Sequence, residues 1–244
     1  CVFASMRTEG QNSVDLLQEL IPAWINGLQG RRFMRWGTGS QRFSRPIRWL
    51  LALKGVDLIP VEIPGADPPV RSDRFSRGHR LHGDQPLPID TAEAYDDTLA
   101  AAGVIVDRQQ RAALIRSQLD ASADQLNGLP DCPESLFEEL VDLVESPRLL
   151  QGSIAERFLS LPPEVIITVM QAHQRYVPLK VPEVTPDPLQ LEATGVLQRD
   201  FLLVGNGLEA ADALITRGNE RVLAARLADA EFFLSVDRRQ PSSA

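Results

Sequence analysis

The order of apolar patterns along the chain limits the folds that it can form. Five segments carry apolar residues three or four positions apart, the spacing of a helix with one buried side. They begin at Ser13, Asp107, Pro133, Pro162 and Asp212. Short apolar runs of strand length lie between them, at 47–63, 176–181 and 201–204. Because these helices and strands do not alternate regularly, the pattern predicts an α+β fold of short mixed strands with flanking helices.

Charge divides the chain into two regions. Residues 1–80 carry 12 positive and 7 negative side chains, whereas residues 81–244 carry 13 and 26. We therefore expect a basic helix-plus-hairpin region at 1–100 and an acidic α+β region at 101–244, joined in one continuous body. The first helix of the basic region should end near Gly30.

Local signals predict where several side chains point. In the hairpin, Trp49 should face the core and Arg48 should point away from it, because neighbouring strand residues alternate between faces.

Asp107 with Gln110 three positions later resembles a capping box. The helix that it opens should have Gly128 at its C-terminal cap.

The next two helices carry well-defined apolar faces. Pro133 suits a first helical turn. The residues predicted to be buried behind it are Leu136, Phe137, Leu140, Val141 and Val144. His173 falls within the apolar face of the helix from Pro162, which favours a hydrogen-bonded core histidine over a ligand. His79 and His82 have an H-x-x-H spacing, but zinc needs three or four protein ligands, so we expect no metal site.

Bulk composition excludes several classes of protein. The longest apolar runs are far shorter than the roughly 18 residues that span a bilayer, so we expect no membrane segment. The cysteines are Cys1 and Cys132, too few for a disulfide framework, and reduced thiols favour a cytoplasmic location. A chain that starts at a cysteine without an initiator methionine also reads as a fragment.

The segment from Leu20 to Val56 contains no carboxylate, although the chain is acidic overall. Its cationic residues are Arg31, Arg32, Arg35, Arg42, Arg45, Arg48 and Lys54. Because salt screens each patch over about 10 Å at 0.1 M, a basic segment can attract a phosphate backbone despite a negative total charge. We call these residues the acid-free segment.

Arginines beside tryptophans make this segment a candidate nucleic-acid contact. Arg35 precedes Trp36 and Arg48 precedes Trp49, a mixture suited to phosphate contact and base stacking. A second cluster is interrupted by Asp73 alone among acids. It comprises Arg71, Arg74, Arg77, His79 and Arg80. The alternatives to RNA contact are an acidic partner subunit and ion pairs within the chain.

The sequence lacks a self-contained catalytic apparatus. The motifs G-x-S-x-G, G-x-x-x-x-G-K-[ST] and H-E-x-x-H are all absent. One helix carries the carboxylates Glu134, Glu138, Glu139, Asp142 and Glu145. They lie mostly opposite its leucine face, which favours a solvated surface over acid–base work. Gly205 and Gly207 fit a dinucleotide fingerprint, but a long helix follows and the turn interpretation is favoured.

The last helix carries an arginine on its apolar side. Arg226 is four residues after Val222, three after Leu223 and seven before Phe233. An arginine in that position needs a partner, and Asp229 lies three residues on. The spacing predicts a structural ion pair, with docking of a partner or RNA as the alternative.

Several short sequence motifs occur in the order known from one family. They are Phe33-Met34-Arg35-Trp36-Gly37, Arg45-Pro46-Ile47-Arg48-Trp49, Arg77-Gly78-His79-Arg80, Leu161-Pro162-Pro163-Glu164, Gln174-Arg175-Tyr176, Gly218-Asn219-Glu220-Arg221-Val222-Leu223 and Arg226-Leu227-Ala228-Asp229-Ala230-Glu231-Phe232-Phe233. Together they resemble the β subunit of bacterial heterotetrameric glycine-tRNA ligase. The resemblance covers nearly the whole chain, from Cys1 to Arg239.

The resemblance implies a division of labour between two subunits. A smaller α subunit would hold the class II active site for glycine and bind ATP with Mg²⁺, in an α2β2 heterotetramer. This chain would bind no cofactor, and would contribute recognition of tRNA(Gly) and assembly without catalysis. The residues expected to contact tRNA or the α subunit are Arg35, Trp36, Arg45, Arg48, Arg77, His79 and Arg80.

The same resemblance implies a fold and leaves two alternative functions open. Part of the family's body resembles the editing-type domain in the β subunit of phenylalanine-tRNA ligase, which suggests a β-rich unit flanked by helices. Fold alone does not settle function. The rival interpretations are an RNA-binding module of another complex and a dinucleotide-dependent enzyme using Gly205 and Gly207.

Overall fold

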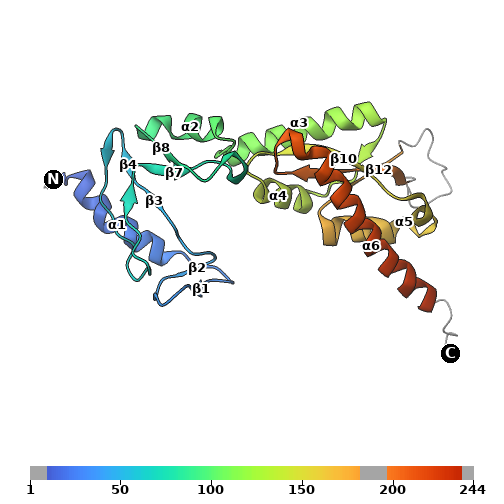
Figure 1. The fold of residues 1–244 in the computed structure, drawn as a ribbon, viewed down its shortest axis with the longest axis horizontal. Coiled ribbons are helices and arrows are strands. Elements are labelled where there is room, and N and C mark those ends of the chain that lie inside the picture. The colour runs from blue at the N-terminus through green and yellow to red at the C-terminus, as the bar shows by residue number, and fades with distance from the viewer. Residues whose placement is uncertain (1–9, 182–196, 238–244) are drawn as a thin grey trace, which may run out of the picture. The chain divides into compact units, whose positions relative to one another are not determined.

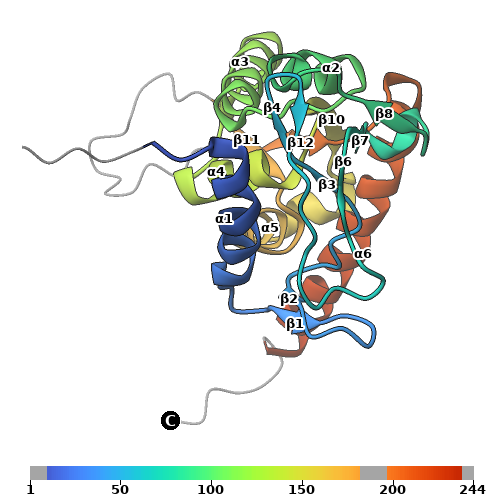
Figure 2. The same ribbon diagram turned by 90° about the vertical axis from the view of Figure 1, so that its left-hand side faces the viewer.

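A computed structural model describes residues 10–181 and 197–237. Three prolines and several acids between residues 182 and 194 predict a surface loop, which lies outside the described residues. The chain forms two compact units, Cys1–Ala102 and Gly103–Ala244 (Figure 1). Figure 2 shows the same helices and strands in a second view. Helices and short strands are mixed in the expected α+β manner.

The first unit contains two helices and eight short strands in its described part. They are α1 (Ser13–Gly27), β1 (Met34–Arg35), β2 (Arg42–Phe43), β3 (Leu50–Leu51), β4 (Leu53–Lys54), β5 (Asp57–Leu58), β6 (Ser72–Asp73), β7 (Phe75–Arg77), β8 (Pro86–Pro88) and α2 (Tyr95–Ala101). The 3-10 turns are η1 (Arg80–His82) and η2 (Ala92–Ala94). The strands pair two by two, β3 with β6 in parallel and the rest antiparallel.

Helix α1 starts at a side-chain cap and covers a small core. The Asn12 side-chain oxygen accepts a hydrogen bond of 2.9 Å from the Val14 backbone, which satisfies a free N–H of the first turn. The helix ends at Gly27, one turn earlier than Gly30. Its apolar residues Val14, Leu17 and Ile21 pack against buried Ala52, Ile59 and Val61.

The expected hairpin is confirmed, but one side-chain direction is wrong. Strands β4 and β5 pair Leu53 with Leu58 around Gly55, whose φ of +56° suits glycine at the turn. Trp49 was expected in the core and is 47% exposed, whereas Ala52 is buried. The buried set is therefore offset by one residue from the expected one, and such an offset reverses the faces of a strand.

The second unit is built around one four-stranded sheet. Its helices are α3 (Arg108–Leu126), α4 (Glu134–Leu143), α5 (Pro163–Thr168), a π-helix (Val169–Gln174) and α6 (Asp212–Asp237). Its strands are β9 (Leu129–Pro130), β10 (Arg148–Ser153), β11 (Val177–Lys180) and β12 (Leu197–Gly205). Two 3-10 turns, η3 (Glu156–Ser160) and η5 (Glu209–Ala211), complete it. The strand order is β10-β12-β11-β9, and every pair is antiparallel.

Side chains alternate across β12 and create two cores. Phe201 and Leu203 pack on the side of α5 and α6, together with Leu223 and Leu227 of α6. Leu202 packs on the opposite side, with α3 and α4. The sheet is thus covered by helices on both faces, as the two-residue period of a strand allows (Figure 1).

Helices α3 and α4 form largely as expected. The Asp107 side chain accepts from the backbone of Gln109 and Gln110 at 2.6 and 3.2 Å. The left-handed cap is Asn127, with φ of 45°, rather than Gly128. All five residues predicted to be buried after Pro133 are buried.

The histidine prediction is wrong. His173 is exposed, whereas His79 is buried, at 2% exposure. The reason lies in the π-helix, whose wider turns hold more residues than an α-helical turn and rotate His173 away from the apolar face. None of the described helices is long and apolar enough to cross a bilayer.

Candidate nucleic-acid interface

The β1–β2 hairpin lies within the acid-free segment and is stabilised by contacts of its own residues. Phe33 and Phe43 bring their ring centroids to 5.0 Å across it, and the Trp36 indole donates to the Phe43 carbonyl at 3.0 Å. Arg42 donates to the Phe33 carbonyl at 3.3 Å. Trp36 is half-buried, so in this unit it holds the hairpin together. Its predicted contact with RNA or a partner remains a prediction.

Five arginines of this segment project into solvent. They are Arg31, Arg32, Arg35, Arg45 and Arg48, and all are exposed. Within 10–181 and 197–237, none of the five forms a salt bridge or a side-chain hydrogen bond. We call them the open arginines. Their charge is available to an external anion, since the neighbouring sequence supplies no carboxylate.

The second arginine cluster is used mostly inside the unit. Arg71 pairs with Glu62 at 2.8 Å, and Arg77 pairs with Asp84 at 2.9 Å. Arg74 donates to the carbonyls of Asp90, at 3.0 Å, and of Val56. For these three arginines, the alternative of contacts within the chain is the one that the geometry supports.

The other two members of that cluster differ in exposure. Arg80 is exposed, and no salt bridge to it occurs in the described residues. His79 is buried, and its Nδ1 accepts from the Leu81 backbone at 3.3 Å. Its backbone N–H donates to Ala102 at 2.9 Å. Such a side chain serves the interior of the unit rather than its surface.

A pocket opens beside the open arginines. It measures about 560 Å³ and is lined by Phe43, Arg45, Pro46, Ile47, Arg48 and Trp49. The arginine pair had been a sequence prediction, whereas the contributions of Phe43 and Pro46 were missed. The available signal was that Phe43 lies between Arg42 and Arg45 and Pro46 between Arg45 and Arg48, because such residues between arginines form apolar surface next to charge.

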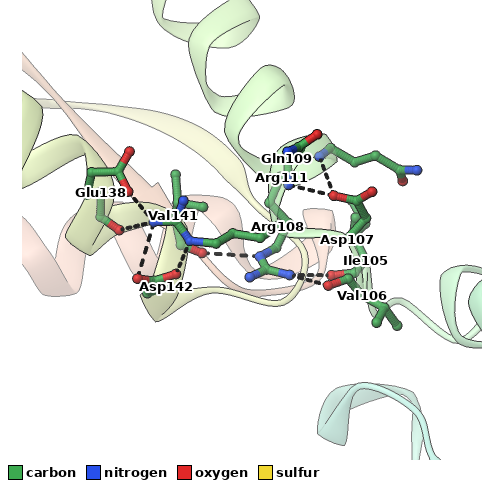
Figure 3. Close-up of polar contacts among 10 residues, drawn as sticks. Ile105, Val106, Asp107, Arg108, Gln109, Arg111, Glu138, Val141 and Asp142 are labelled. Atoms are coloured by element: carbon green, nitrogen blue, oxygen red, sulfur yellow. Dashed lines mark hydrogen bonds and ion pairs between the residues drawn. The ribbon is translucent and has the colours of Figure 1, made fainter. Parts of the chain in front are cut away.

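Arginines of the second unit face carboxylates instead. Figure 3 shows Arg108 reaching Glu138 and Asp142, with 2.7 Å between its Nε and an Asp142 oxygen. Arg116 pairs with Glu134 at 3.5 Å. Further pairs join Arg175 to Glu139 at 2.8 Å and Arg148 to Asp212 at 2.6 Å.

These pairs explain the carboxylate cluster on α4. Arg108 donates hydrogen bonds to Asp142 and thereby lowers the pKa of that carboxyl. A general acid needs the opposite shift, toward a pKa near the working pH. The five carboxylates are exposed, and Glu134, Glu138, Glu139 and Asp142 pair with arginines, as expected of a solvated surface. Burial raises the pKa of the Cys132 thiol to about 11, which disfavours the nucleophilic thiolate at neutral pH.

The glycine-rich turn after β12 has a structural use. The Asn206 side-chain oxygen accepts from the backbone of Glu145 at 3.1 Å and of Ser146 at 3.0 Å. Strand β12, which ends at Gly205, has antiparallel neighbours on both sides. A dinucleotide fingerprint requires a parallel βαβ unit, so this geometry supports the turn interpretation.

The last helix corrects the placement of Arg226. The buried residues of α6 include Leu223 and Leu227, which are four positions apart. Val222 and Arg226 occupy the neighbouring row and are exposed, as is Phe233. An exposed arginine needs no buried partner. The described residues show no salt bridge from Arg226 to Asp229, and their pairing stays a prediction.

Comparisons with known proteins agree with the phrases found in the sequence. The family model described as glycyl-tRNA synthetase beta subunit matches residues 1–244. The chain is 42% identical over 240 residues to the glycine–tRNA ligase beta subunit of Gloeothece citriformis, covering 98% of this chain and 33% of that protein. The beta subunit of Moorella thermoacetica is 42% identical over 245 residues, covering 100% of this chain and 33% of that protein.

A third relative gives the same result. The glycine–tRNA ligase beta subunit of Acaryochloris marina is 41% identical over 240 residues, which is 98% of this chain and 32% of that protein. These matches place the chain in the class of aminoacyl-tRNA synthetase subunits. It belongs to the glycyl-tRNA synthetase beta subunit family. The chain spans about a third of the length of these relatives.

Proposed function

We propose that this chain is a non-catalytic part of a glycine–tRNA ligase, and that it contributes tRNA recognition and subunit assembly. It supports ATP-dependent glycylation of tRNA(Gly) by an α subunit, in a cytoplasmic α2β2 heterotetramer. The observation that carries the proposal is the set of open arginines in the acid-free segment. Family membership supplies the reaction in which such a surface would be used.

Physical chemistry favours a polyanion as the partner of these arginines. The charge of an exposed arginine without a carboxylate nearby is not neutralised within the protein. Its guanidinium can donate two parallel hydrogen bonds to a phosphate. Arg45 and Arg48 lie on one pocket wall, and Arg35 lies on β1 of the hairpin. A tRNA backbone presents repeated phosphates and can engage several of them together.

ATP and its Mg²⁺ belong to the α subunit in this proposal. The chain has no P-loop sequence. Among the carboxylates of α4, Glu134, Glu138, Glu139 and Asp142 pair with arginines, which leaves them poorly placed to hold a metal–nucleotide complex. The chemistry of glycine activation would then proceed on the partner.

The test replaces two open arginines in the full-length β subunit, assembled with its α partner. Arg45→Gln with Arg48→Gln should weaken tRNA(Gly) binding about tenfold at 0.1 M salt. The slope of log K against log salt should fall by roughly 1.4–1.8, because each phosphate contact releases about 0.7–0.9 counterions. Fluorescence anisotropy with labelled tRNA over a salt series measures both, and a glycylation assay reports the consequence.

The matched control removes two arginines that already have partners. Arg71→Gln with Arg175→Gln changes the net charge equally, but both side chains pair with carboxylates. It should leave the salt slope nearly unchanged. An unaltered slope in the Arg45 and Arg48 variant, with intact folding and assembly, overturns the tRNA assignment. Dissociation of the α subunit from that variant would instead identify the segment as a subunit contact.

A further inference from the structure

The pocket beside Trp49 has a composition that differs from an ordinary surface hollow. Its lining side chains are two open arginines and the four apolar or aromatic residues Phe43, Pro46, Ile47 and Trp49. No carboxylate contributes to its wall. Its volume of about 560 Å³ falls within the range of small-molecule sites, roughly 300–1,000 Å³. An occupant should therefore combine a flat apolar body with negative charge.

The indole of Trp49 has a cation–π contact with a residue that does not line the pocket. The Arg77 guanidinium lies over its ring, 5.8 Å from the centroid, and Asp84 holds Arg77 at 2.9 Å. Trp49 nevertheless remains 47% exposed. A ring that is oriented before binding loses little conformational freedom when a second ring stacks on it. The exposed part of the ring is the surface for such a partner.

The arginines determine what the second ring must carry. Arg45 and Arg48 are exposed on the pocket wall and form no salt bridge with any described residue. Phosphate is an anion that guanidinium groups bind with two parallel hydrogen bonds. A nucleotide unites an aromatic base with phosphates on either side, and bases of single-stranded RNA stack on aromatic side chains. Paired bases inside a duplex are stacked on each other and are not available for this.

We propose that this pocket binds one unpaired nucleotide of RNA, with its base stacked on Trp49 and its flanking phosphates on Arg45 and Arg48. The inference rests on the proposed tRNA recognition and adds a single-stranded binding site to it. Apart from Arg45 and Arg48, which hold the phosphates in this proposal, the lining side chains include no charged or amide group to read a base edge. The site should therefore discriminate weakly among the four bases. It should bind a nucleotide that carries a base much more tightly than a sugar–phosphate backbone without one.

The test compares two probes on the full-length β subunit assembled with its α partner. One is a fluorescein-labelled eight-nucleotide oligouridylate, and the other has the same ribose–phosphate backbone without bases. The wild-type complex should bind the base-bearing probe about tenfold more tightly through this site, the gain typical of stacking one base. Trp49→Leu keeps apolar volume but removes the aromatic ring, and should reduce the preference by that factor. Trp49→Phe should retain most of it.

Two further variants separate this inference from the proposed function. Trp24→Leu removes another exposed tryptophan, on α1, and should change nothing. Arg45→Gln with Arg48→Gln should weaken both probes alike. If Trp49→Leu leaves the preference for bases intact while the arginine variant still weakens binding, the nucleotide pocket is refuted and tRNA contact stands. If neither variant alters binding to folded complexes, both proposals fail.

Discussion

The open arginines of the first unit and four paired arginines of the second unit serve opposite purposes. In the first unit, the open arginines extend into solvent from a stretch of chain without acids. In the second unit, Arg108, Arg116, Arg148 and Arg175 each pair with a carboxylate of the same unit. The difference separates charge that stabilises the chain from charge that can attract a partner. It also shows why the pI of about 5.0 says little about binding.

The largest expected effect on stability concerns Arg111 of α3. Its Nε donates to the Val141 carbonyl at 3.1 Å, and its Nη1 donates to Ile105 and Val106 at 2.8 and 2.9 Å (Figure 3). Arg111→Met would leave carbonyl groups without donors and cost about 2 kcal/mol. Hydrogen exchange of α3 and α4 peptides in the full-length β subunit should then be roughly 30-fold faster.

The open arginines provide the control for this prediction. Arg45→Gln should leave exchange in α3 and α4 unchanged and should lower the salt dependence of tRNA binding. Arg111→Met should accelerate exchange in α3 and α4 and leave the salt dependence of tRNA binding unchanged. The comparison between the two units would break if Arg111→Met altered the salt slope of a folded complex, because an arginine bound to three carbonyls would then also act as an RNA contact.

Elements with two independent signals were predicted well from the sequence. Helix α3 has the side-chain cap of Asp107 and buried Ile115 and Leu119 at helical spacing. Strand β12 could be recognised because its central residues are continuously apolar. Trp49 was misplaced because strands of two residues define no period that fixes a face. His173 was misplaced because a π-turn is not visible in an α-helical pattern.

The sequence shows where arginines gather, but not which of them pair with carboxylates of the same chain. Sequence revealed the arginine-rich phrases, yet gave no means of distinguishing Arg48 from Arg77. The carboxylate that pairs with an arginine can be far away in the chain, as Asp212 is from Arg148. Only folding decides which charges meet. The pocket at Trp49 was hidden for the same reason, since its opening depends on which face of the strand is buried.

A moderate effect is expected where a pair is partly sheltered. Arg148 of β10 contacts Asp212 at the start of α6 through Nη2 at 2.6 Å and Nε at 3.2 Å. Asp212 also lies in the first turn of α6, where the helix dipole favours a carboxylate. Arg148→Gln should cost about 1 kcal/mol, a value at the upper end for exposed pairs. Exchange at the start of α6 should accelerate about fivefold.

The ion pair of Arg71 and Glu62 is the exposed counterpart of the pair of Arg148 and Asp212. Their distance of 2.8 Å is equally short, but the two side chains are 76% and 52% exposed. Solvent and salt screen such a pair, so Arg71→Gln should leave hydrogen exchange in its neighbourhood unchanged. A loss as large as that of Arg148→Gln would show that distance alone, rather than shelter from water, sets the strength of these pairs.

The smallest effect is a pH dependence from Asp142. Arg108 lowers the pKa of this carboxyl in the folded chain relative to its ordinary value of about 3.9. The pair therefore stabilises the fold fully above that value, and the contribution disappears as pH falls through the folded pKa. The difference in urea midpoint between the wild-type β subunit and Asp142→Asn should be constant above about pH 5 and vanish on acidification. Asp124→Asn, an exposed carboxylate on α3, should show no such difference. A wild-type advantage over Asp142→Asn that persisted below the folded pKa would mean that Arg108 acts through geometry rather than charge.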